Sequence, residues 1–295
     1  MDSHEIDAVR AMLGAKPRPV GWVERRARIE EVGASSPVAS DITLDPVTLG
    51  GVHGEYSLAP GSDPSRLLVY FHGGGFCSGS IISHRRLVTE AGRAAGIRTL
   101  AVAYRLAPEH PFPAAHEDAL AVWGALRAGG MPAARIAIAG DSAGGNLAIG
   151  LANRLRAAGE PQPACLWLLS PWTDLAMTGE SLGLKDADDP LIHKPYLEEL
   201  AHAYLDGTDR ADPLVSPLRA DLRGFPPTLV QVGSAETLLE DSVRFARAAA
   251  LADVAVGLEV WPRMIHAFPM WNAQLADGRR ALARAGAWMR GLLDG

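Results

Sequence analysis

Short apolar runs alternate with helical patterns along most of the chain, and this alternation constrains its fold more than any other feature. Six runs are predicted as strands: residues 66–71, 97–104, 135–140, 165–170, 227–233 and 256–262. Helical patterns lie at residues 116–128, 144–159, 240–252 and 278–293 and in a stretch that ends near Gly96. Strands that are apolar throughout and alternate with helices are typical of a parallel sheet covered on both faces. We therefore expect an α/β fold, with two further strands, residues 42–45 and 51–58, paired antiparallel at one edge.

Two segments interrupt this alternation, namely residues 1–40 and residues 178–214. The first contains short helical patterns among prolines, and the second is a polar stretch around one predicted helix, residues 195–205. Long insertions often carry function. We expect a single domain, residues 1–295, in which both segments pack over the ends of the strands as a cap. Ordinary peripheral structure is the alternative.

The composition argues against several classes of function. The chain has 295 residues, with 28 Lys and Arg against 34 Asp and Glu, so its net charge of −6 offers no electrostatic footprint for nucleic acid or an anionic membrane. No apolar run approaches the ~20 residues of a membrane span, and the N-terminal sequence lacks the apolar core of a secretory signal. Cys77 and Cys165 have neither a metal-ligand spacing nor a disulfide framework. We expect a cytoplasmic protein with free thiols and no metal site.

The segment "AGDSAGGN" stands where a predicted buried strand ends and a helix begins. It contains a G-x-S-x-G pattern centred on Ser142. In this context the pattern predicts a nucleophile elbow, a tight turn that exposes the serine hydroxyl above the sheet. The helix that follows directs backbone N–H groups toward any nearby anion. The alternative is a glycine-rich turn without catalytic function.

An earlier segment, "YFHGGGF", places three glycines in a row after a predicted strand. Acyl transfer at a serine builds negative charge on the carbonyl oxygen, which preorganised N–H donors stabilise. A glycine loop of this kind supplies such donors together with the residue after the nucleophile. The candidates are Gly74, Gly75 and Ala143. We expect His72 to hold the loop by hydrogen bonding instead of performing acid–base chemistry.

A serine nucleophile needs a base, and in this arrangement the base follows it in the chain. Three histidines come after Ser142. His193 and His202 lie in the expected cap, whereas His266 follows the last predicted strand, where the base of such a site is expected. His266 is therefore the predicted base, with a structural loop histidine as the alternative.

The acid that orients this base is expected just after the strand at residues 227–233. The segment "GSAETLLEDS" offers three carboxylates there. Glu236 is nearest the end of the strand and is preferred. Glu240 and Asp241 fall in the first turn of the next predicted helix, where acidic side chains also interact favourably with the helix dipole. Asp241 remains open as the alternative acid.

Six segments together resemble those of the hormone-sensitive-lipase-like esterases, the bacterial family IV branch of the α/β-hydrolases. They are "YFHGGGF", "YRLAPEHPFPAAHEDA", "GDSAGGNLA", "SPWTDL", "GSAETLLEDS" and "MIHAF". The resemblance implies an α/β-hydrolase core of about eight strands, a helical cap, and hydrolysis of short-acyl carboxylic esters without a metal or organic cofactor. The family's acid is usually followed by Pro-Leu, and here Glu236 is followed by Thr237 and Leu238. The family's other functional positions correspond to Ser142, His266, Gly74, Gly75 and Ala143.

Three alternatives stay open beside a serine carboxylesterase acting on a small-molecule ester. A lactone hydrolase is one, since the C-terminal third is also similar to acetyl-hydrolases and lactone hydrolases. An amidase or peptidase is another, because the same triad cleaves amides. The third is a ligand-binding receptor on the same scaffold, which the presence of His266 disfavours because such a receptor can dispense with that histidine. A monomer and a homodimer are both compatible with the sequence.

Overall fold

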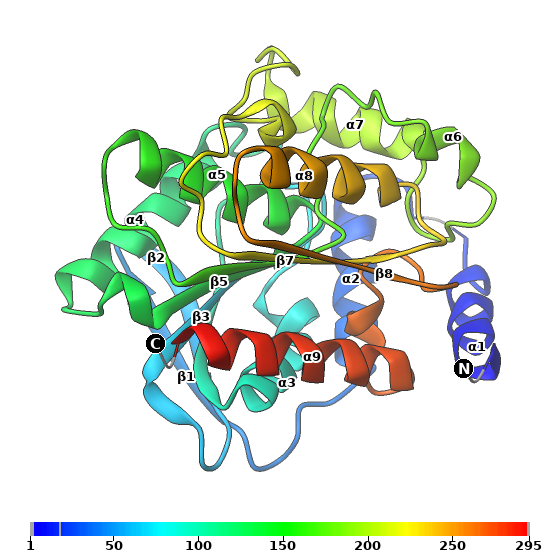
Figure 1. Cartoon of the computed structure of the whole chain (residues 1–295). Coiled ribbons are helices and arrows are strands. Elements are labelled where there is room, and N and C mark those ends of the chain that lie inside the picture. The colour runs from blue at the N-terminus through cyan, green and yellow to red at the C-terminus, as the bar shows by residue number, and fades with distance from the viewer. Residues whose placement is uncertain (1–2, 18, 294–295) are drawn as a thin grey trace.

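Within residues 3–17 and 19–293, which the computed structural model describes, eight strands form one sheet (Figure 1). The strands are β1 (Thr43–Leu49), β2 (Val52–Leu58), β3 (Asp63–Phe71), β4 (Ile97–Val102), β5 (Ile136–Asp141), β6 (Cys165–Leu169), β7 (Thr228–Gly233) and β8 (Val256–Trp261). Their order is β1-β2-β4-β3-β5-β6-β7-β8. β1 pairs with β2 and β2 with β4 antiparallel, and the other neighbouring pairs are parallel. The expected α/β fold with an antiparallel edge is confirmed.

Helices cover both faces of this sheet. They are α1 (Ser3–Gly14), α2 (Trp22–Ala34), α3 (Ile81–Ala95), α4 (Ala114–Ala128), α5 (Ala143–Ala157), α6 (Ser181–Leu184), α7 (Lys194–Leu205), α8 (Leu239–Leu251) and α9 (Ala276–Leu293), with short 3₁₀ turns at Ala133–Arg135, Pro217–Arg219 and Phe268–Trp271. In Figure 1, α3 and α9 lie on one side of the sheet and α5 and α8 on the other. None of these described helices has the length and apolar character that crossing a membrane requires.

The apolar strands pack into both layers. Successive side chains of a strand point to opposite faces. Along β3, Leu67 and Val69 therefore pack in the cluster that includes α4, α5 and α8, whereas Leu68 and Tyr70 pack in the cluster that includes α3 and α9. From Leu67 to Phe71 both faces of β3 are buried, which explains why this part of the strand is apolar instead of alternating with polar residues.

The predicted elements differ from the structure mainly at their ends. The strand expected at residues 97–104 ends at Val102. Tyr104 has left the sheet, and its hydroxyl donates to the carbonyl oxygen of His72 (2.6 Å) in the loop after β3. The strand expected from residue 66 begins earlier, at Asp63, because Asp63 already pairs with Ile97 of β4.

The two segments outside the alternation contribute α1, α2, α6 and α7. Ile6 and Val9 of α1 are buried against Ile265 and Phe268, which follow β8. α2 packs on α3, and α7 buries Leu200 in the main core cluster, which is the cluster that includes α4, α5 and α8. Both segments therefore contact the loops that follow the strands, at the end of the sheet where β5 leads into α5.

Candidate active site

Ser142 occupies the turn between β5 and α5 in a strained conformation. Its backbone has φ 53° and ψ −120°, a region that non-glycine residues rarely adopt. A Cβ atom added to Gly144 would lie 1.9 Å from the carbonyl oxygen of Phe71, and one added to Gly140 would lie 2.3 Å from the backbone of Gly144. Both flanking glycines are therefore required sterically, because the turn presses β5, α5 and the end of β3 together.

The loop after β3 brings Gly74 and Gly75 to the same cavity as Ser142. Both have positive φ, 115° and 64°. A Cβ atom on Gly74 would lie 2.2 Å from the carbonyl oxygen of Ser78, and one on Gly75 would lie 2.4 Å from Cδ1 of Leu200 in α7. The loop thus needs glycine both for its backbone conformation and for its close approach to α7.

Ala143, the third predicted oxyanion donor, is the first residue of α5 and is fully buried. Its side chain does not line the cavity. The first N–H groups of a helix have no acceptor within the helix. The backbone N–H of Ala143 is therefore in the class of donors that such a site uses.

Asp141 anchors the glycine loop to the elbow. Its carboxylate accepts hydrogen bonds from the Gly73 N–H (2.9 Å) and the Tyr70 hydroxyl (2.9 Å), and Nε2 of His84 lies 3.3 Å away. Burial by itself would raise the pKa of Asp141, but His84 and Tyr70 more than offset this, so the pKa lies below its ordinary value. An ionised Asp141 thus holds the glycine loop and the elbow together.

His72 is fixed inside the same loop. Its Nδ1 lies 2.8 Å from the carbonyl oxygen of Gly73, and its ring stacks on Tyr104 with 4.3 Å between ring centroids. Burial and the nearby His84 lower the pKa of His72 to about 3. A neutral, stacked imidazole in this position agrees with the expected role in holding the loop.

His266 and Glu236 meet beyond the ends of β8 and β7. Nδ1 of His266 lies 3.3 Å from Oε2 of Glu236, whose side chain is fully buried. The same oxygen accepts a hydrogen bond from Oγ of Ser170 (2.9 Å), and that hydroxyl accepts one from the Ala267 N–H (3.1 Å). Ser170 thereby links the acid loop to the residue that follows His266.

The electrostatics of this pair favour a charged imidazole. Burial by itself would lower the pKa of His266, but the Glu236 carboxylate more than offsets this, so the pKa of His266 is raised. Burial raises the pKa of Glu236, while His266 and Ser170 act in the opposite direction. Glu236 therefore stabilises the imidazolium form of His266 relative to an unpaired buried imidazole.

The two alternative acids are engaged elsewhere. The Asp241 carboxylate accepts hydrogen bonds from the N–H groups of Thr173 (2.7 Å) and Asp174 (2.9 Å) in the loop after β6. Burial raises the pKa of Asp241 to about 7. Glu240 accepts a hydrogen bond from the Ser181 N–H (3.1 Å) at the start of α6. This geometry favours Glu236 as the residue that orients His266.

Asp189 is a supporting residue that the sequence did not reveal. Its carboxylate accepts hydrogen bonds from the N–H groups of Leu191 (2.9 Å), Ile192 (3.0 Å) and Thr237 (2.9 Å). It therefore ties the segment before α7 to the loop that carries Glu236. No local signal distinguishes it, because Asp189 stands in a polar stretch among several other carboxylates.

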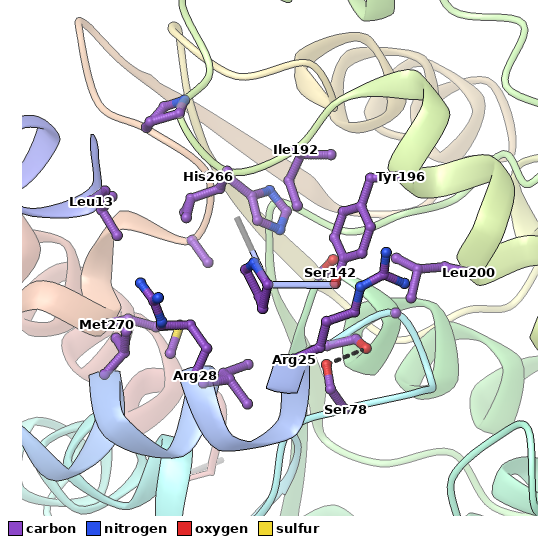
Figure 2. Close-up of a pocket in the computed structure, with 18 of the residues that line it drawn as sticks. Leu13, Arg25, Arg28, Ser78, Ser142, Ile192, Tyr196, Leu200, His266 and Met270 are labelled. Carbon is purple, nitrogen blue, oxygen red and sulfur yellow. Dashed lines mark hydrogen bonds between the residues drawn. The ribbon is translucent and has the colours of Figure 1, made fainter. Parts of the chain in front are cut away.

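A cavity of about 620 Å³ contains both Ser142 and His266 on its wall (Figure 2). Its other walls include the end of α1 at Met12 and Leu13, α2, the segment from Pro190 to Leu200, and the 3₁₀ turn that contains Met270. Trp22 does not line it and packs instead against the main core cluster. Cavities of this size hold small organic ligands.

No group of metal-binding side chains occurs in the part of the chain that the structure describes. Cys77 and Cys165 are free and buried. Burial raises the pKa of each thiol to about 12, so neither is a reactive thiolate at neutral pH.

A sheet of this order, with a serine elbow after β5 and a histidine after β8, defines the class of α/β-hydrolases. The profile of a family described as alpha/beta hydrolase fold matches residues 68–270. An acetyl-hydrolase of Streptomyces hygroscopicus is 44% identical over 98% of this chain and 97% of its own length, and an esterase of Acinetobacter venetianus is 41% identical over 84% and 82%.

The crystal structure of an esterase from the bacterial hormone-sensitive lipase family has a TM-score of 0.96 at 41% identity, over 99% of both chains. The chain belongs to the α/β-hydrolase family and, within it, to the bacterial hormone-sensitive-lipase-like esterases. It is a serine carboxylesterase that hydrolyses carboxylic esters.

Proposed function

We propose that the chain hydrolyses short-acyl esters or lactones through a triad of Ser142, His266 and Glu236 and an acyl-enzyme intermediate. The observation that carries the proposal is the 3.3 Å approach of His266 to a fully buried carboxylate, beside the cavity that contains Ser142. A histidine oriented in this way can act as the general base for a neighbouring hydroxyl.

The reaction runs in two halves. Oγ of Ser142 attacks the ester carbonyl carbon, and His266 takes the hydroxyl proton. The resulting imidazolium is stabilised by Glu236 and then donates its proton to the departing alcohol, which leaves an acyl group on Ser142. In the second half a water molecule attacks the acyl carbon, with His266 again as the base. The carboxylic acid leaves and Ser142 is restored.

The oxyanion of each tetrahedral intermediate is stabilised by backbone N–H groups of Gly74, Gly75 and Ala143. The support is positional: the two glycines line the cavity beside Ser142, and Ala143 begins α5. Losing one such donor typically lowers kcat by about 10²–10³. The firm anchoring of the glycine loop by Asp141 keeps these donors in place before the substrate binds.

The substrate is enclosed by a cap made from residues 1–40 and 178–214. The support is that α2 and the segment from Pro190 to Leu200 both line the cavity. A preference for short acyl chains, with acetyl among them, is supported by the relative that is named an acetyl-hydrolase and matches nearly the whole chain. The acyl chain is expected to lie between the cap and the end of the sheet.

The test is a Ser142→Ala variant assayed with p-nitrophenyl acetate, butyrate and palmitate. We expect the variant to lose at least about 10⁴ in kcat while keeping its fold, and the wild type to prefer the two short esters. Phenylmethylsulfonyl fluoride should add its sulfonyl group to the wild type and not to the variant, as measured by mass spectrometry. Ser65→Ala, at an exposed serine, is the matched control.

Near-normal turnover by Ser142→Ala would reject the proposed nucleophile. Faster hydrolysis of palmitate than of butyrate would reject the short-acyl preference. Equal rates on a p-nitroanilide and on the p-nitrophenyl ester of the same acyl group would favour an amidase instead.

A further inference from the structure

Two arginines of α2 line the cavity one helical turn apart. Arg25 and Arg28 both extend from α2 into the cavity (Figure 2), as expected for residues three positions apart on one helix face. Arg26 points the other way and donates to the carbonyl oxygens of Cys77 (2.9 Å) and Ala107 (2.9 Å). These bonds fix the rotation of α2 about its axis, so the other two arginines are held toward the cavity.

Arg25 is built into the wall of the cavity. Its guanidinium lies 5.0 Å from the ring centroid of Trp22 and 4.9 Å from that of Tyr196, and only 12% of its side chain is exposed. Its counter-ion, Glu199, has 58% of its side chain exposed. The positive charge therefore lies in the cavity wall, paired with a more exposed carboxylate that lines the same cavity.

The guanidinium of Arg28 makes only long contacts with its neighbours among the described residues. Its Nε lies 3.7 Å from the Glu31 carboxylate, which is already 3.0 Å from the ammonium of Lys16. Its Nη2 reaches the carbonyl oxygen of Pro17 only at 3.4 Å. Apolar side chains such as Met270 share this part of the cavity. An arginine with weak partners in partly apolar surroundings attracts a carboxylate more strongly than one in open solvent does.

The cavity does not share the acidic surplus of the chain. The chain carries a net charge of −6. The described Lys, Arg, Asp and Glu side chains that line the cavity are three cations, Lys16, Arg25 and Arg28, and three carboxylates, Glu31, Asp141 and Glu199. Asp141 is held at the elbow by the Gly73 N–H and the Tyr70 hydroxyl, so the groups of the cavity that attract an anionic ligand are the cations on and beside α2.

We propose that Arg28, supported by Arg25, makes the pocket selective for esters that carry a carboxylate. The proposal rests on the proposed function, because the ester group is placed at Ser142 and the carboxylate at α2. The guanidinium of Arg28 would bind the carboxylate through two parallel N–H···O bonds. The substrate class is thus either half-esters of dicarboxylic acids or short-acyl esters of hydroxy acids.

Two matched pairs of substrates distinguish a carboxylate in the acyl part of the ester from one in the alcohol part. Mono(p-nitrophenyl) glutarate against p-nitrophenyl pentanoate tests a carboxylate in the acyl part. The butyryl ester of p-hydroxybenzoate against the same compound as its methyl ester tests a carboxylate in the alcohol part. For each pair, kcat/KM is measured for the wild type, Arg28→Gln, Arg28→Lys and Arg247→Gln, at low and high ionic strength. Arg247 is an exposed residue of α8 that does not line the cavity, so it controls for the change in net charge.

We expect the wild type to favour the anionic member of one pair, and Arg28→Gln to lower that ratio of kcat/KM about tenfold or more, which is about 1.4 kcal/mol per tenfold. Arg28→Lys should retain part of the preference, high salt should weaken it, and Arg247→Gln should leave it unchanged. Equal ratios in the wild type and Arg28→Gln for both pairs would overturn the proposal. Calorimetry of the Ser142→Ala protein with the same four esters distinguishes a failure of this proposal from a failure of the proposed function. Tighter, Arg28-dependent binding of an anionic ester upholds this proposal even if hydrolysis fails. Equal binding of the anionic and neutral esters rejects it even if the neutral esters are hydrolysed.

Discussion

Replacing Glu236 by Gln removes the negative charge beside His266 while keeping a side chain of nearly the same size. At the observed separation of 3.3 Å, and with an effective dielectric constant of about 20, a carboxylate stabilises an imidazolium by about 5 kcal/mol. Because about 1.4 kcal/mol corresponds to a factor of ten in rate, losing this stabilisation lowers kcat by roughly 10³–10⁴. The amide also permits the wrong histidine tautomer, which acts in the same direction.

The matched comparison is Asp241→Asn, a second buried carboxylate that lies five residues further along the chain. Its partners are the N–H groups of Thr173 and Asp174, and an amide oxygen can still accept from them. We therefore expect kcat within about tenfold of the wild type. The loss should instead appear in thermal stability, at about 2–4 °C in Tm per kcal/mol for a chain of this size class.

The assay is steady-state hydrolysis of p-nitrophenyl butyrate at neutral pH, with circular dichroism and thermal melts to show that each variant is folded. A crippled Asp241→Asn beside a nearly normal Glu236→Gln would show that the acid has been misassigned. Two nearly normal variants would refute the role of a carboxylate partner altogether.

Two further predictions concern the base and the oxyanion loop. His266 accepts a proton only when its ring is neutral. Burial lowers the pKa of His266, but the Glu236 carboxylate more than offsets this, so the pKa is raised. We therefore expect kcat/KM to fall as the pH drops through this raised pKa. In Glu236→Gln the acid limb should move to lower pH, and a limb at the same pH in both proteins would contradict this origin. Gly75→Ala places a Cβ atom 2.4 Å from Leu200 at a φ of 64°, so it should displace the loop and lower kcat by about 10² or more. Gly61→Ala, also at positive φ but with open space around it, is the control for backbone strain, and equal losses in the two variants would point to strain alone.

Much of the fold and part of the site could be predicted from the sequence because their causes are local. Strands buried on both faces are mostly apolar, and this pattern marks them before any contact is known. The elbow is similar: the turn around Ser142 requires glycine at both flanking positions, since side chains there would collide with neighbouring backbone. Such steric requirements are written in the residues themselves.

The sequence could reduce the choice of the carboxylate that orients His266 to three candidates, but it could not select among them by position alone. Glu236, Glu240 and Asp241 lie within six positions of one another, and all three follow the same strand. Which carboxylate approaches His266 depends on how the loop turns, and that depends on distant partners: Ser170 for Glu236, and Thr173 for Asp241. Sequence position alone carries no information on these directions.

The sequence by itself determined a serine hydrolase built on a mostly parallel sheet, because periodicity and steric motifs act over a few residues. Only the tertiary structure decided what surrounds the nucleophile. Arg25 and Arg28 precede Ser142 by more than a hundred residues, and they reach its cavity because Arg26 fastens α2 to carbonyl oxygens of two other loops. The charge of the pocket arises from contacts between segments far apart in the chain, and such contacts leave no local pattern to read.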